Sequence, residues 1–180
     1  AHDAEIDELL ILKEKRLQIE TVLEHRAAIA ANVRTYADAT NEISVMIAMA
    51  NAGQPGALQS AGKILTAMET ILAHESVALS LVCAESKPEP GQELAMQAMN
   101  VTSLAIMTAK TLGFTPQEIE YVGIGALFHN IGMNRVALAV RVKQEEDMSP
   151  TETKLLRMYP QLGKEMLEAI PGVAPEVIEI

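Results

Sequence analysis

The sequence has few aromatic residues and relies on aliphatic and flexible apolar side chains instead. None of its 180 residues is Trp, and Phe, Trp and Tyr together make up 3% of the chain. Ala, Leu, Ile and ten Met supply most of the 49% hydrophobic content, which is enough to bury a sizeable core in one domain. Because this mixture favours helix over sheet, we predict an all-α protein.

Positive charge is also scarce. Fourteen Lys and Arg stand against 24 Asp and Glu, which gives a formal net charge of −10. No cluster of Lys and Arg stands out that could follow a phosphate backbone. We therefore expect neither nucleic acid nor an anionic membrane surface as a partner.

Cysteine and long apolar runs are nearly absent as well. The single Cys83 cannot form an internal disulfide, and we interpret it as a buried helix residue rather than a metal ligand. The apolar runs are too short to span a membrane, and the first residues lack the basic start and apolar middle of a signal peptide. The sequence accordingly predicts a cytoplasmic protein without a membrane span.

The N-terminal stretch from Ala4 to Ala50 contains neither Pro nor Gly. Apolar and charged residues recur there at helical spacing, which predicts one or two long amphipathic helices. Its heptad positions are apolar apart from two arginines: Leu9, Leu12, Arg16, Ile19, Leu23, Arg26, Ala30 and Val33. The pattern fits a short coiled coil that joins two protomers, or a helix that lies along its own domain. We assign residues 1–34 to this helix or linker and residues 35–180 to a helical domain.

Turn residues divide the remaining chain into shorter helices. A break at Asn51–Gly56 precedes a predicted helix over residues 58–74. Two prolines and a glycine at Lys87–Gly91 then prevent a helix from continuing. The next helix is predicted over residues 93–112, followed by Gly113 at the C′ position.

Two capping boxes mark the starts of later helices. Thr115–Glu118 and Ser149–Glu152 each combine an N-cap hydroxyl, a proline at the first helical position and a glutamate at the third. The helix after Thr115–Glu118 ends in an apolar run that is followed by His129 and Asn130. We expect this polar pair to lie on a turn at Gly132.

Two helices joined by Leu112-Gly-Phe-Thr115, the second ending in His129-Asn-Ile-Gly132, resemble the HD superfamily of metal-dependent phosphohydrolases. They are most similar to the HD-GYP branch, whose active members bind divalent iron or manganese and hydrolyse the bacterial messenger cyclic di-GMP. The resemblance extends downstream through Ser149–Glu152 to Tyr159-Pro-Gln-Leu-Gly163 and covers residues 35–180. It implies an HD-superfamily helical bundle preceded by the long N-terminal helix.

The resemblance also places the metal ligands of the family on this chain. Gln97 stands where the helix before the linker carries a ligand histidine, and His129 and Asn130 stand at the His-Asp pair. Met133 replaces the lysine of that motif, and Tyr159 replaces the next ligand histidine. The later His-His-Glu and Gly-Tyr-Pro motifs of the family would follow the end of this sequence.

These substitutions remove most of the metal-binding chemistry. A metal centre that activates water needs carboxylates or neutral imidazoles that converge on the ion. Amide and phenol groups are weak ligands, and a thioether cannot contact a phosphate as an ammonium does. We therefore expect Gln97, His129, Asn130, Met133 and Tyr159 to form a vestigial site with no catalytic residue, metal or cofactor. In that site Gln97 and Tyr159 would complete a hydrogen-bond network, and Asn130 would cap or turn the backbone.

Three functions fit the sequence. The first is a catalytically degenerate HD-GYP-like domain that serves as a binding or regulatory module in bacterial signal transduction. The partners it implies are other signalling proteins, such as a diguanylate cyclase or a fused regulatory domain. The second function is a divergent metal-dependent phosphohydrolase that acts on cyclic di-GMP. The third is an HDOD-type regulatory domain, a metal-free relative with the same helical core.

Overall fold

The computed structural model describes residues 2–72 and 92–179, except for the side chains of residues 2–12, 14, 25 and 28. The described residues form helices and no strands, which confirms the predicted all-α fold. The helix predicted to reach residue 74 is described as far as Leu72. Cys83 and the predicted helix break at Lys87–Gly91 lie outside the described residues.

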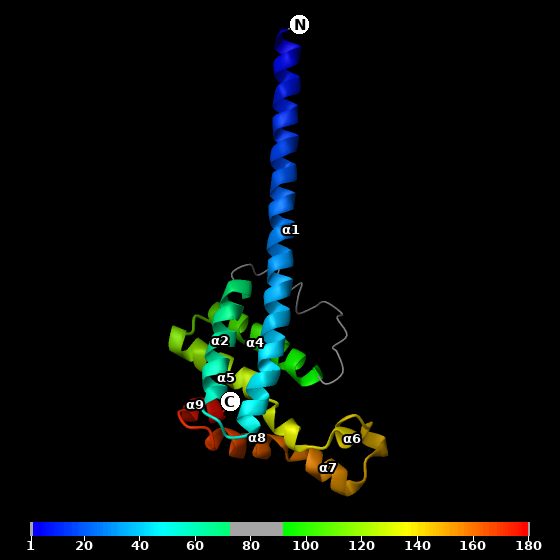
Figure 1. The fold of residues 1–180 in the computed structure, drawn as a ribbon, viewed down its shortest axis with the longest axis vertical. Coiled ribbons are helices and arrows are strands. Elements are labelled where there is room, and N and C mark those ends of the chain that lie inside the picture. Colours follow the sequence, from blue (N-terminus) through cyan, green and yellow to red (C-terminus); the bar gives the residue numbers. More distant parts are fainter. Residues whose placement is uncertain (1, 73–91, 180) are drawn as a thin grey trace.

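The N-terminal stretch forms one continuous helix, α1 (His2–Asn51). At about 1.5 Å per residue its 50 residues span about 75 Å. Figure 1 shows its N-terminal part projecting from a helical body built by the rest of the chain. The helix ends at a turn where Gly53 has a φ of +62°, a conformation that glycine adopts without strain. The long N-terminal helix is therefore confirmed as a single element.

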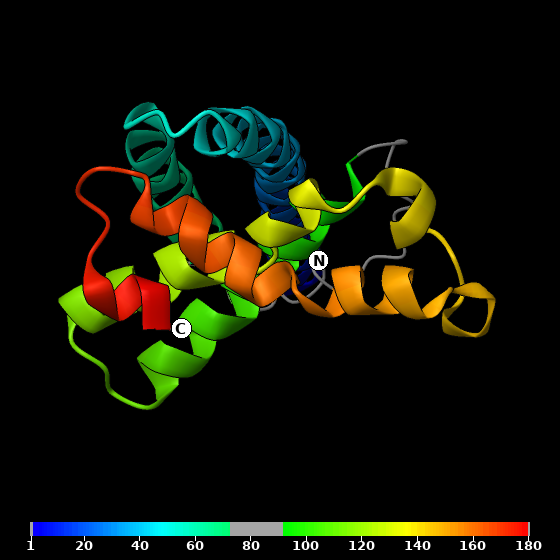
Figure 2. The ribbon, with the colours of Figure 1, turned by 90° about the horizontal axis from the view of Figure 1, so that it is seen from below.

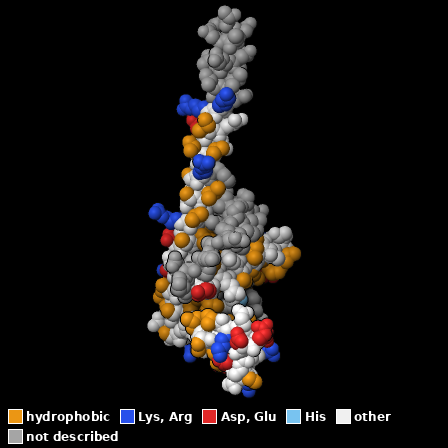
Figure 3. All heavy atoms as spheres, turned by 90° about the vertical axis from the view of Figure 1, so that its right-hand side faces the viewer, with side chains coloured by type: hydrophobic (Ala, Val, Ile, Leu, Met, Phe, Trp, Pro, Cys, Tyr) orange, Lys and Arg blue, Asp and Glu red, His pale blue; other side chains and the backbone are white. Residues whose placement is uncertain are grey.

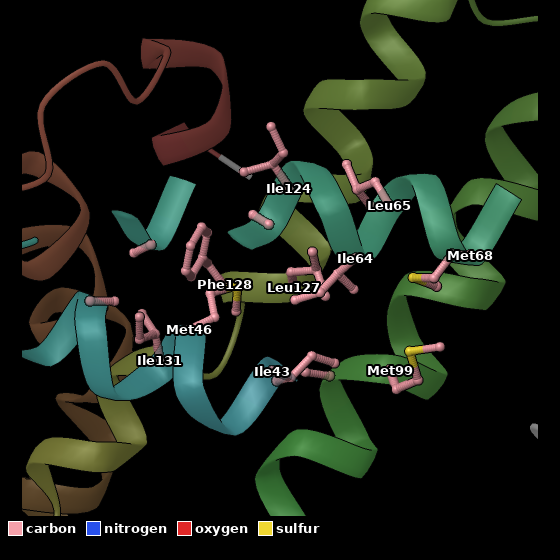
Figure 4. Close-up of a cluster of buried hydrophobic side chains, with 14 of the residues drawn as sticks. Ile43, Met46, Ile64, Leu65, Met68, Met99, Ile124, Leu127, Phe128 and Ile131 are labelled. Atoms are coloured by element: carbon pink, nitrogen blue, oxygen red, sulfur yellow. The ribbon is translucent and has the colours of Figure 1, made fainter. Parts of the chain in front are cut away.

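The C-terminal half of α1 packs on α2 (Gly56–Leu72) and on α4 (Glu93–Thr111), and α2 also packs on α4 and α5 (Pro116–Phe128). Figure 4 shows the side chains that converge between these helices. The largest fully buried ones are aliphatic or methionine side chains with one phenylalanine: Phe128, Ile43, Met46, Ile64, Met68 and Met99. Each such side chain contributes about 1.5–3 kcal/mol when it leaves water. The core thus reflects the composition, in which methionine replaces aromatic bulk.

The connection between α4 and α5 follows the predicted turn chemistry. Gly113 has a φ of +77° and ends α4 in the left-handed region. Thr115 then caps α5: the Glu118 amide donates to its hydroxyl at 3.3 Å, and its own amide donates to the Glu118 carboxylate at 2.8 Å. The same reciprocal bonds between Ser149 and Glu152 open a later helix, α7 (Pro150–Arg157). Both predicted capping boxes are therefore confirmed.

The remaining elements lie at the end of the body where α5 finishes. α8 (Tyr159–Glu168) crosses this end, while short helices before it form an arm to one side (Figures 1 and 2). In chain order the other elements are η1 (Ile131–Arg135), α6 (Leu138–Arg141), η2 (Glu145–Asp147), the already named α7, and α9 (Pro175–Glu179). α9 packs back on α5 and α8. No helix of the described residues is long and apolar enough to cross a membrane.

Gly132 lies where η1 crosses the start of α8. A Cβ atom on Gly132 would lie 1.9 Å from the carbonyl oxygen of Tyr159 and 2.6 Å from the amide nitrogen of Gly163. The positive-φ glycines of the described residues are Gly53, Gly113 and Gly172, so Gly132 does not serve a left-handed turn. His129 and Asn130 form the predicted turn, which leads into a 3-10 helix where Gly132 provides space for a neighbouring backbone.

Tyr36 connects the two layers of the body. Its hydroxyl, on α1, donates a hydrogen bond to Oδ1 of Asn100 on α4, and both side chains are half-buried. Burial raises the pKa of Tyr36 to about 12, because the charged phenolate would lose hydration. The bond therefore fixes the position of α1 against α4 only while the phenol keeps its proton.

Replacing Gly132 by alanine should destabilise the protein by about 3 kcal/mol or more, because the added methyl group meets backbone atoms that cannot rotate away. Gly62 in α2 is the matched control, since a Cβ atom there would meet no atom within 4 Å. Gly62→Ala should leave stability unchanged or raise it by up to about 1 kcal/mol. Urea unfolding of both variants measures the difference, and equal stabilities would contradict the close crossing.

Stability should also fall at alkaline pH through Tyr36. The folded-state pKa lies above the ordinary value of 10.0, so its contribution is fully present below pH 10 and is lost as the pH rises toward 12. Tyr36→Phe should be less stable than the wild type at pH 8 and should lose less stability between pH 10 and 12. Tyr121→Phe, which removes only an exposed bond from Gln117, should keep the wild-type pH dependence. Chemical unfolding at several pH values tests this, and parallel curves for wild type and Tyr36→Phe would refute it.

Candidate functional site

His129 stands at the C-terminal end of α5, where it is half-buried. Its Nδ1 atom lies 2.7 Å from the carbonyl oxygen of Ala126, one turn earlier in the helix. Because a carbonyl oxygen can only accept, Nδ1 carries the hydrogen, and in the neutral ring Nε2 is the acceptor. His129 is therefore a helix-end histidine with one nitrogen bonded and the other available for a ligand.

A hollow of about 320 Å³ opens beside His129. Its walls come from the end of α5, one face of α8 and the last helix, α9: Gly125, Phe128, His129, Pro160, Gln161, Gly163, Lys164, Leu167, Val177, Ile178 and Glu179. Apolar side chains form most of this wall, and the polar groups are an imidazole, an amide, an ammonium and a carboxylate. The crossing of η1 and α8 at Gly132 brings these elements together.

The other four predicted site residues do not line this hollow. Asn130, Met133 and Tyr159 are half-buried at the crossing of η1 and α8, next to the elements that carry His129. Gln97 is exposed on α4, whose core-facing positions are taken by small and apolar residues such as Ala98 and Met99. The structure thus places His129 close to the start of α8 and leaves Gln97 outside the hollow.

One finer expectation about these residues is wrong, and another is confirmed in one of its two forms. Gln97 does not take part in a hydrogen-bond network of the site, because it faces solvent. Asn130 turns the backbone rather than capping it: its side chain makes no capping hydrogen bond, and its backbone carbonyl accepts from the Met133 amide at 2.9 Å. The side chain that bonds to the backbone of η1 is Asn134, whose Nδ2 donates to the Ile131 carbonyl at 3.0 Å.

Lys164 and Gln161 are polar residues of the hollow that sequence reasoning missed. Each points along α8 to a carboxylate four residues later: Lys164 Nζ lies 3.8 Å from Glu168, and Gln161 donates to Glu165 at 3.3 Å. Their spacing of three residues puts them on one face of a helix, which the sequence could have revealed. What it could not reveal is that this face would lie beside His129.

The donors around His129 are poorly suited to a metal ion. Among the side chains that the structure describes, no three His, Cys, Asp or Glu residues come close enough together to hold one. Glu179 is the carboxylate of the hollow, and the ammonium of Lys164 would repel a cation. The arrangement can therefore bind a small polar molecule or a side chain through His129 and Lys164 more readily than it can assemble a divalent metal pair.

Comparison of the chain with protein-family models, with curated proteins and with solved structures gives no match. The resemblance to the HD superfamily therefore depends on the sequence motifs alone.

The tautomer of His129 can be tested directly. Nδ1 of the neutral ring should carry the hydrogen, since it faces the Ala126 carbonyl at 2.7 Å. Long-range ¹H–¹⁵N spectra above pH 8 should then give a protonated shift for Nδ1 and an unprotonated shift for Nε2. The same spectrum of His129→Gln identifies the resonances. A protonated Nε2 would contradict this geometry.

Proposed function

We propose that the chain is a catalytically degenerate HD-GYP-like domain that acts as a binding or regulatory module in bacterial signal transduction. In this proposal the helical body keeps the scaffold of a phosphohydrolase, and the site around His129 has lost the ligands that would make it an enzyme. Its partners would be signalling proteins, including a diguanylate cyclase or a regulatory domain fused to the same chain.

The observation that carries the proposal is the set of groups beside His129. A metal-dependent phosphohydrolase needs several carboxylates and imidazoles around its ions. Here the hollow offers one imidazole with an amide, an ammonium and the single carboxylate of Glu179, and its walls are mostly apolar. These groups favour recognition of a partner over activation of water.

The order of the elements supports the relation to the HD superfamily. The pair α4 and α5, joined by a tight glycine turn, delivers His129 at the end of α5, as the resemblance implies. The Tyr159-Pro-Gln-Leu-Gly163 segment then returns as α8 to pack on η1, so the two most distinctive motifs meet in space. An HDOD-type domain would use the same arrangement.

A divergent phosphohydrolase acting on cyclic di-GMP is the second candidate, and one observation favours it. Metal-ligating histidines donate one ring N–H to a backbone carbonyl or carboxylate, which leaves the other nitrogen free for the ion. His129 has that arrangement through the Ala126 carbonyl. It would retain the chemistry of one ligand, to which groups outside the described residues would have to be added.

Metal content and turnover discriminate the two candidates. Protein purified without chelator should contain less than about one iron or manganese per chain, and it should not hydrolyse cyclic di-GMP after titration with either ion. His129→Ala should then leave the residual metal content and the amount of nucleotide product unchanged. Gln97→Ala serves as an exposed control on α4. Elemental analysis and chromatography of the nucleotide products are the measurements.

The result that would overturn the proposal is equally concrete. Stoichiometric binding of two divalent ions, with hydrolysis that His129→Ala abolishes and Gln97→Ala preserves, would identify a working phosphodiesterase with unusual ligands. The preserved activity of Gln97→Ala would exclude a general effect of substitution on folding.

A further inference from the structure

We draw no further inference here: the strongest candidate, the exposed apolar face around Ile19 and Leu23 on the projecting part of α1 (Figure 3), carries none because nothing in the described residues shows what covers it.

Discussion

The backbone of η1 crosses the backbone of α8 at Gly132 and Gly163, so closely that Gly132 has no room for a side chain. The arrangement of α5, α8 and α9 around the hollow depends on that contact. The crossing holds the end of α5 against α8, and with α9 it encloses the hollow beside His129. A larger residue at Gly132 would push η1 away from α8 and separate His129 from Gln161 and Lys164.

The long helix α1 joins two surfaces with different chemistry. Its C-terminal half supplies Ile43 and Met46 to the core and is fixed to α4 through the bond between Tyr36 and Asn100. Its projecting half presents Ile19 and Leu23 to solvent on another side of the same helix. Because a helix transmits a rigid displacement along its length, a displacement of the projecting half would reach the core packing.

Local signals in the sequence predicted most of the helix boundaries. The absence of Pro and Gly up to Ala50 predicted one or two long helices where α1 lies. Gly113 and the capping boxes at Thr115 and Ser149 predicted the later ends and starts, because these effects depend on residues only a few positions apart. The site was less predictable. The solvent-facing position of Gln97 and the close contact of Gly132 with the α8 backbone both depend on which face of one helix meets another. The position of Lys164 beside His129 could not be predicted either, because it depends on how η1 crosses α8.

The proposed binding or regulatory function requires that the site around His129 does not hold a metal ion. Addition of Mn²⁺ to the protein while the side-chain ¹H–¹⁵N resonances of His129 are observed tests it most directly, since the paramagnetic ion broadens the signals of any nearby ligand. The account predicts that stoichiometric Mn²⁺ leaves these resonances as sharp as those of distant backbone amides. Selective loss of the Nε2 resonance at one or two equivalents would contradict it and would assign His129 as a metal ligand.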